Sequence, residues 1–300
     1  MGNMYSRWYA GSLVIYPGDS GPGTEFFVDS TNGLDTNTGL DWINALATID
    51  AANDKCTASN GDKIIVAPFH TEDLAADSAI DLDTEGVTVV GVNFGRQMPT
   101  LNATATAGDC KLAAANVTVS GIRFTGGIDA TTGIVEVSGA DCALIGCEYR
   151  DVTGQATDVI TTVDGSDRLL IDGFTCFGAA GAGGNSAIAV DGSDDIIIRN
   201  CYIHGNFAVG AIDFRTTLSA RMNVHDCKIW TTNTADIAIV DTITGSTGFI
   251  GPNIQAMLAD DAANITEAIT AATCQMVDPI YIVNLAGQKA LLTNIAASSD

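Results

Sequence analysis

The sequence has 300 residues, of which 36 are acidic and 13 basic, so its formal net charge at neutral pH is −23. Such a charge repels DNA, RNA and anionic lipid, so we expect neither nucleic-acid binding nor membrane binding. No apolar stretch is long enough to span a bilayer. No basic segment followed by an apolar run opens the chain, so we also expect no secretory signal.

Residues 1–24 form a predicted N-terminal arm. The arm is too apolar for a free tail and too short to fold alone, and the Pro- and Gly-rich residues 17–23 then break the chain. It either lies along the chain's own first coils or docks on a partner or a neighbouring subunit. The candidate docking side chains are Tyr5, Trp8, Tyr9, Leu13, Ile15 and Tyr16.

Residues 25–60 are predicted to cap the first coil. A short strand at residues 26–28 precedes a turn-rich loop and then an apolar helix face that includes Leu46 and Ile49. The helix could begin at Asp41 or Asn44, which are suitable N-cap residues. A helix laid across the open end would cover both the core and the exposed strand edges.

The loop inside this cap is rich in oxygen ligands, among them Asp29, Asn32 and Asp35. It lacks the ligand spacing of an EF-hand and its bidentate glutamate. We therefore expect these side chains to make hydrogen-bonded turns. A structural calcium ion at this loop is the weaker alternative, and no other cofactor is expected.

Residues 61–256 contain a motif that recurs seven times. The copies align on a turn-prone residue with steps of 25 to 30, at Gly91, Gly121, Gly146, Gly173, Asn200, Asp226 and Gly251. In each copy, the positions four and two before this anchor and one and three after it are apolar in 26 of 28 cases. This alternation predicts a strand on each side of a tight corner.

Stacking the seven copies places equivalent apolar side chains above one another. Gly, Asn and Asp enter the left-handed backbone region at the lowest cost, which suits a sharp corner. We therefore predict an all-β fold, a right-handed parallel β-helix with an N-terminal helical cap. Its neighbouring coils would lie about 4.8 Å apart.

Residues 257–300 are predicted to cap the far end. Residues 257–273 have the apolar spacing of a helix, and residues 279–294 read as a β-hairpin with its turn at Ala286-Gly287. Five of the eight cysteines fall in inward positions, where a thiol behaves as a small apolar group. Cys201 and Cys227 occupy the same position on adjacent coils, but we expect core packing there, not a disulfide.

Two segments carry a resemblance. FVDSTNGLDTNTGLDWINALATIDAAND, followed by GDKIIVAPFHTE, resembles the cap and first coil of the pectate-lyase-like β-helix superfamily, with Phe69-His70 where that pattern has Gly-x-Tyr. The opening MGNMYSRWYAGSL resembles the start of some tailed-phage virion proteins. Together these resemblances imply a β-helical phage structural protein, made and assembled in the host cytoplasm and located in the virion.

Catalytic residues are hard to find on this scaffold. Asp194-Asp195 and His204-Gly205 resemble two members of the polygalacturonase series, but Asp195 falls at a predicted corner, where turn chemistry explains it. No pair of carboxylates at the spacing of a glycosidase is evident. We therefore expect no enzyme activity and assign no catalytic residue.

The outward positions suggest a binding surface instead. Aromatic and basic side chains recur on adjacent coils, and such residues are typical of interface centres and sugar-binding faces. Three uses stay open: a subunit interface, cover by the chain's own arm, and glycan binding. The candidate residues are Arg150, Phe177, Arg199, Tyr202, His204, Lys228 and Trp230.

These features favour a non-enzymatic phage virion protein, a capsid decoration or tail-associated β-helix. It would bind itself, as a trimer, and other virion proteins such as the major capsid protein through its termini, with host glycans as a further partner. The alternative is a polysaccharide lyase, a glycoside hydrolase or a glycan-binding adhesin module of a tail spike.

Overall fold

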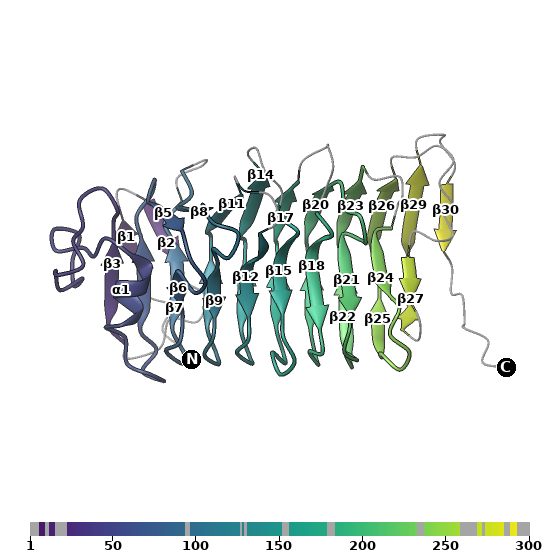
Figure 1. Cartoon of the computed structure of the whole chain (residues 1–300), viewed down its shortest axis with the longest axis horizontal. Helices are drawn as coiled ribbons and strands as arrows, with labels where there is room; N and C mark the ends of the chain where they lie inside the picture. The colour runs from purple at the N-terminus through teal and green to yellow at the C-terminus, as the bar shows by residue number, and fades with distance from the viewer. Residues whose placement is uncertain are drawn as a thin grey trace.

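The computed structural model is a parallel β-solenoid, as predicted, whose strands follow one another along the long axis of the molecule (Figure 1). It describes residues 6–9, 12–15, 23–93, 97–126, 128, 131–151, 156–178, 184–232, 237–258, 269–271, 274–284 and 289–292. Within these ranges, three long sheets run the length of the rod. No helix in the same ranges is long and apolar enough to cross a membrane.

Sheet 1 holds the strands that precede each predicted corner. Its members are β3 (Glu25–Val28), β4 (Lys63–Val66), β7 (Thr88–Gly91), β10 (Thr118–Ser120), β13 (Ala143–Ile145), β16 (Leu170–Asp172), β19 (Ile197–Arg199), β22 (Met222–His225), β25 (Gly248–Ile250) and β28 (Gln275–Met276). Neighbouring strands in this sheet pair in parallel.

Sheet 2 holds the strands that follow the corner. Its members are β5 (Thr71–Leu74), β8 (Thr100–Ala103), β11 (Arg123–Gly126), β14 (Glu148–Asp151), β17 (Thr175–Phe177), β20 (Tyr202–Gly205), β23 (Lys228–Thr231), β26 (Ile254–Leu258), β29 (Ile280–Asn284) and β30 (Lys289–Leu292). The last strand, β30, pairs antiparallel with β29, which confirms the predicted C-terminal hairpin.

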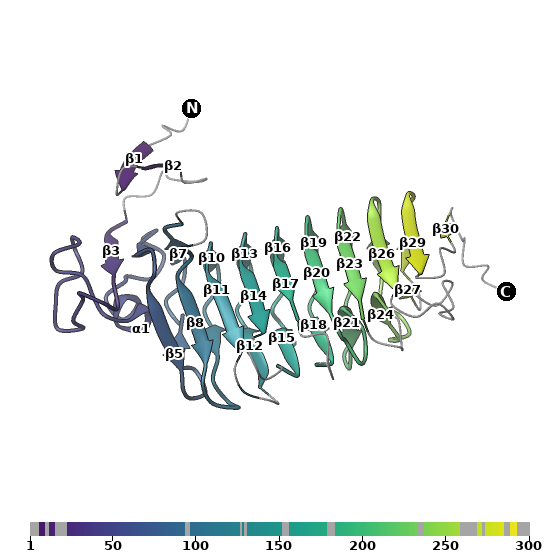
Figure 2. The ribbon, with the colours of Figure 1, turned by 90° about the horizontal axis from the view of Figure 1, so that it is seen from above.

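Sheet 3 closes each coil. Its members are β6 (Ile80–Asp81), β9 (Cys110–Leu112), β12 (Thr132–Val137), β15 (Asp158–Thr162), β18 (Ser186–Asp191), β21 (Ile212–Arg215), β24 (Ile239–Asp241) and β27 (Ile269–Ala271). Loops between sheets 2 and 3 and between sheets 3 and 1 complete the coil. Seen from above, the strands keep the same order along the rod (Figure 2).

The predicted apolar file is confirmed. Val119 pairs with Leu144, Leu144 with Ile171, and Ile171 with Ile198, and all four side chains are buried. At the corner beside this file, Gly146 and Asn200 adopt positive φ angles of 59° and 55°. Equivalent side chains therefore stack because the five corners from Gly121 to Asp226 turn at the same place with a positive φ angle.

The seventh corner differs from the prediction. Phe249 pairs with Asn223, an outward residue, and is half-exposed, while Ile250 takes the buried position beside Val224. The positive-φ residue that stacks on Asp226 is Asn253, whose side-chain amide donates to Asp226 Oδ1. The corner lies two residues further along than in the predicted alignment, so the anchor assigned to Gly251 is wrong.

The N-terminal cap contains the predicted helix in a shorter form. Helix α1 (Ile49–Asn53) begins after Thr48, whose hydroxyl accepts from the Ala51 amide. Its start at Asp41 or Asn44 is therefore wrong, because Asp41 caps a separate turn by accepting from the Asn44 amide. The apolar face that closes the coil is as predicted, with Leu46, Ile49 and Ala52 fully buried.

The predicted C-terminal helix at residues 257–273 is also wrong where the structure describes it. Met257 belongs to β26 and Ile269 to β27, and both strands continue the parallel sheets. The alternating burial of β26 fits a strand, in which successive side chains face opposite sides. Residues 259–268 lie outside the described ranges.

The N-terminal arm includes a hairpin that the sequence analysis did not predict. Strands β1 (Ser6–Tyr9) and β2 (Ser12–Ile15) pair antiparallel as a sheet of their own. Trp8, Tyr9, Leu13 and Ile15 lie on these strands. Tyr5 and Tyr16 lie outside the described residues, and docking by the arm stays a prediction.

Candidate functional site

Sheet 2 presents two outward columns of side chains on adjacent strands. The strand register places one column through Thr175, Tyr202, Lys228, Gln255 and Tyr281. The same pairings place the second column through Phe177, His204, Trp230, Met257 and Val283. Side chains two residues apart on one strand share a face, so both columns lie on the outside of the rod.

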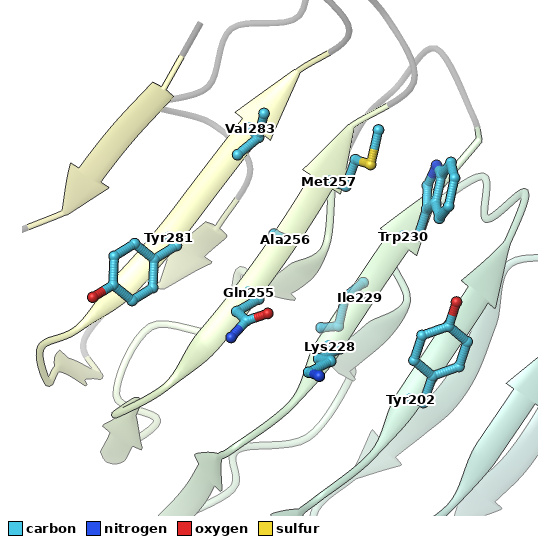
Figure 3. A pocket seen from close by; sticks show the side chains of 9 residues that line it. All are labelled: Tyr202, Lys228, Ile229, Trp230, Gln255, Ala256, Met257, Tyr281 and Val283. Carbon is cyan, nitrogen blue, oxygen red and sulfur yellow. The ribbon is translucent and has the colours of Figure 1, made fainter. Parts of the chain in front are cut away.

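A groove with a volume of about 530 Å³ lies over the C-terminal part of these columns. Figure 3 shows Tyr281, Gln255, Lys228 and Tyr202 in one row, with Met257 and Trp230 in the row beside it. The complete lining is Tyr202, Lys228, Ile229, Trp230, Gln255, Ala256, Met257, Tyr281 and Val283. Aromatic and aliphatic walls with a few polar groups are typical of a ligand site.

The aromatic side chains of this face contact one another across strands. The rings of Phe177 and Tyr202 lie 5.8 Å apart in a tilted arrangement. The rings of His204 and Trp230 meet edge to face at 5.2 Å. The guanidinium of Arg150 lies 5.1 Å from the centre of the Phe177 ring. These contacts leave Phe177, Tyr202 and Trp230 each more than a third exposed, as predicted for an outward stripe.

The face differs in charge from the rest of the molecule. From β5 to β29, its outward side chains in sheet 2 include three cations, Arg123, Arg150 and Lys228, and two acids, Asp73 and Glu148, which leaves these strands a formal charge of +1. The whole chain carries −23. The acidic residues are therefore concentrated elsewhere, and an anionic ligand is repelled less here than over the remaining surface.

Most of these cations have partners. Glu148 Oε1 accepts from the Nε atoms of Arg123 and Arg150, each at 2.6 Å. Burial alone would raise the pKa of Glu148, but these hydrogen bonds outweigh it and hold the pKa below its usual value. Lys228 makes no ion pair with any residue that the structure describes, so its ammonium group is the cation available to a ligand.

The structure brings together six of the seven predicted surface residues: Arg150, Phe177, Tyr202, His204, Lys228 and Trp230. Arg199 is the exception. It lies on β19 in sheet 1, where its guanidinium pairs with Asp172 at 2.8 Å. Arg199 lies outside this surface because the corner at Asn200 turns the chain from sheet 1 into sheet 2, and a binding role for Arg199 stays a prediction.

The sequence pattern did not predict the C-terminal half of the groove. Gln255, Met257 and Tyr281 belong to it, but the predicted repeat ended at Gln255 and the hairpin was treated as separate. A signal was available, because Ile280 and Ile282 repeat the alternation of Ile254 and Ala256.

The calcium candidates are held in turns. Asp29 accepts from the Thr31 amide and the Asn32 side chain, and Asp35 Oδ1 accepts from the Ala47 and Thr48 amides. Across the described part of the chain, no group of three or more His, Cys, Asp or Glu side chains is placed to hold a metal ion. A calcium ion at this loop stays a prediction.

Acidic residues elsewhere serve the fold. Asp195 has a φ of 58° and pairs with Arg221 on the next coil, which confirms its turn role. On sheet 3, Arg215 pairs with the buried Asp158 and lies 3.7 Å from Asp213. Burial raises the pKa of Asp213. The neighbouring acidic residues Asp158 and Asp213 were not predicted, and they lie on a different sheet from the groove.

The cysteines are all free, which agrees with their predicted role in the core. Cys201 and Cys227 stack without a disulfide.

An internal column of serine side chains was not predicted. Ser166, Ser193 and Ser219 are buried on successive coils, and the hydroxyls of Ser166 and Ser193 lie 2.7 Å apart. Their recurrence at steps of 27 and 26 residues was the available signal.

The fold and the groove together define a parallel β-solenoid with an exposed aromatic face. No family model matches the chain, and no curated protein matches it either. Among solved structures, it is similar to the crystal structure of an alginate lyase from Paenibacillus sp. str. FPU-7. The two are 12% identical with a TM-score of 0.37, over 79% of this chain and 90% of that one.

This comparison corrects the predicted function. The prediction of a phage virion protein is wrong: the structural match is to an alginate lyase, and no comparison supports a phage particle. At this identity and TM-score the likeness carries no further argument, so the case for a ligand rests on the groove itself.

Proposed function

We propose that the chain binds a polysaccharide in the groove over β20, β23, β26 and β29. The observation that carries this proposal is the lining, in which the rings of Tyr202 and Tyr281 stand on either side of the polar groups of Lys228 and Gln255, with the Trp230 ring in the column beside them. A sugar ring has an apolar face that packs on an aromatic ring and hydroxyl groups at its edge. The groove supplies a partner for each of these surfaces.

The polar groups suit hydroxyl and carboxylate recognition. The Lys228 ammonium group donates up to three hydrogen bonds, and the Gln255 amide both donates and accepts. Because Tyr202 and Tyr281 also carry hydroxyl groups, each end of the groove combines an apolar ring with a hydrogen-bonding tip. Such amphipathic side chains favour a ligand that is itself apolar on its faces and polar at its rim.

Affinity electrophoresis of the full chain tests this function. Gels containing alginate, polygalacturonate or a soluble β-glucan should retard the chain relative to a non-binding reference protein, and retardation should saturate with polysaccharide concentration. Retardation in the alginate or polygalacturonate gel alone would indicate that the carboxylates are recognised. Unchanged mobility in all three gels would contradict the proposal.

A second candidate function is β-elimination on a uronic-acid polysaccharide. Tyr202 and His204 lie on β20, directly beside Lys228 and Trp230 on β23. The ammonium group of Lys228 would neutralise the sugar carboxylate and so acidify the neighbouring carbon-bound proton. Tyr202 or His204 would then accept that proton, which is the usual role of such side chains. The C–H electrons form a carbon–carbon double bond as the glycosidic C–O bond breaks, and the leaving oxygen takes up a proton from water or from the newly protonated base.

Product formation distinguishes the two candidates. Elimination should give unsaturated products that absorb in the near ultraviolet, and Lys228→Gln should abolish them while the chain still binds the polysaccharide. Binding without any absorbing product would leave a binding protein and exclude elimination for the polysaccharides tested.

A further inference from the structure

We infer that the groove, together with the adjoining ring of Phe177, takes an extended polysaccharide that lies along the rod axis and covers about five sugar residues. This inference rests on the proposed function and adds the direction and the length of the ligand. It follows from the dimensions of the binding face and from the positions of its aromatic side chains.

The binding face is narrow along the strands. Each strand of this part of sheet 2 presents two outward side chains, and these lie about 7 Å apart because a strand rises about 3.3 Å per residue. A polysaccharide running along a strand would leave the aromatic face after roughly one sugar ring. A polysaccharide in that direction would therefore contact aromatic side chains over only about one sugar ring.

The face is long across the strands. Aromatic side chains occur on β17 (Phe177), β20 (Tyr202), β23 (Trp230) and β29 (Tyr281), with Gln255 and Met257 on the intervening β26. These five strands are consecutive neighbours in sheet 2. At about 4.8 Å per strand, the row from Phe177 to Tyr281 extends about 19 Å.

The spacing of the strands is close to the length of one sugar ring in an extended 1,4-linked chain. Such a chain laid across the strands would therefore meet each strand with one ring. The row also has a boundary at its N-terminal end, where Arg150 covers Phe177 and is itself held by Glu148. The aromatic row thus has a finite length, with Trp230 on the central strand β23.

Two defined oligosaccharide series test this inference by calorimetry on the full chain. Oligomannuronates and cello-oligosaccharides of increasing length share the extended 1,4-linked backbone and differ in charge. In whichever series binds, affinity should rise about tenfold or more between the dimer and the pentamer and then level off, because further rings pass the last aromatic side chain.

Variants at the two ends of the aromatic row test whether the bound oligosaccharide extends over its whole length. Phe177→Ala and Tyr281→Ala should each weaken the pentamer about fourfold, since each exposed ring offers roughly 35 Å² of contact to a sugar. Both should leave binding of the dimer unchanged, because a dimer can occupy the centre near Trp230. Phe249→Ala is the matched control, since its exposed ring lies on sheet 1.

The outcomes distinguish the inference from the proposed function. The inference would be overturned if affinity levelled off at the dimer, or if neither end variant changed the affinity for the pentamer. Polysaccharide binding itself would stand in both cases. If neither series bound, the inference would fail. If the three polysaccharide gels were negative as well, the proposed function would fail with it.

Discussion

Removal of the Trp230 ring is the most direct perturbation of the groove. A tryptophan side chain can bury up to about 250 Å², and Trp230 is 39% exposed, so roughly 100 Å² of it stays accessible. A sugar ring that covers half of this area removes about 50 Å² from water, worth about 1.2 kcal/mol at 25 cal/mol per Å². Trp230→Ala should therefore weaken polysaccharide binding by about eightfold.

Calorimetric titration of the polysaccharide into the wild-type chain and the variant measures this loss. Phe249→Ala serves as the control, because it removes a half-exposed aromatic ring from another face of the rod. Circular dichroism should confirm that both variants keep the wild-type fold. Equal affinity of Trp230→Ala and wild type, or an equal loss in the control, would refute the assignment of the groove.

Three further outcomes test the core and its ionisable groups. Ile171→Ala should lower the free energy of unfolding by about 2–5 kcal/mol in urea, whereas the outward Ile145→Ala should change it by less than about 0.5 kcal/mol; similar losses would contradict the stacked core. Burial raises the pKa of Asp109 to about 6, so the folded chain binds this proton more tightly than the unfolded chain, and stability falls as pH rises from about 4 to about 6. Urea midpoints across this range should fall less in Asp109→Asn than in wild type, and identical slopes would exclude this contribution. Burial also raises the pKa of Cys56 to about 12, and the other thiols are buried. A thiol reagent should therefore label the native chain slowly, and should label all eight cysteines in urea. Fast labelling of several thiols in the native chain would contradict this burial.

The repeat itself could be predicted because it depends on local rules. Alternating apolar residues on each side of a Gly, Asn or Asp corner determine a two-strand unit, and stacking such units is the way they can bury their apolar faces. The file from Val119 to Ile198 and the cap residues Leu46 and Ile49 follow from this pattern. The stripe of Tyr202 and Trp230 follows as well, since outward positions alternate with inward ones.

Boundaries and register were predicted less well. The predicted alignment pairs Val224 with Phe249, but in the structure Val224 pairs with Ile250, so Phe249 was placed in the core although it faces outward. A strand has a period of two, and a shift of one residue therefore exchanges its faces completely. The short strands beyond Gln255 carry too few residues to distinguish a strand from a helix by periodicity alone.

The sequence by itself determined that this chain is a rod of stacked parallel strands and that one of its faces carries exposed aromatic rings. Only the tertiary structure decided that Tyr281, far along the chain, stands in the same row as Tyr202, and that Arg199 lies around the corner on another sheet. The physical reason is that a groove forms from neighbours between coils. Which residues become neighbours depends on the summed lengths of all the loops between them, and a local pattern does not report that sum.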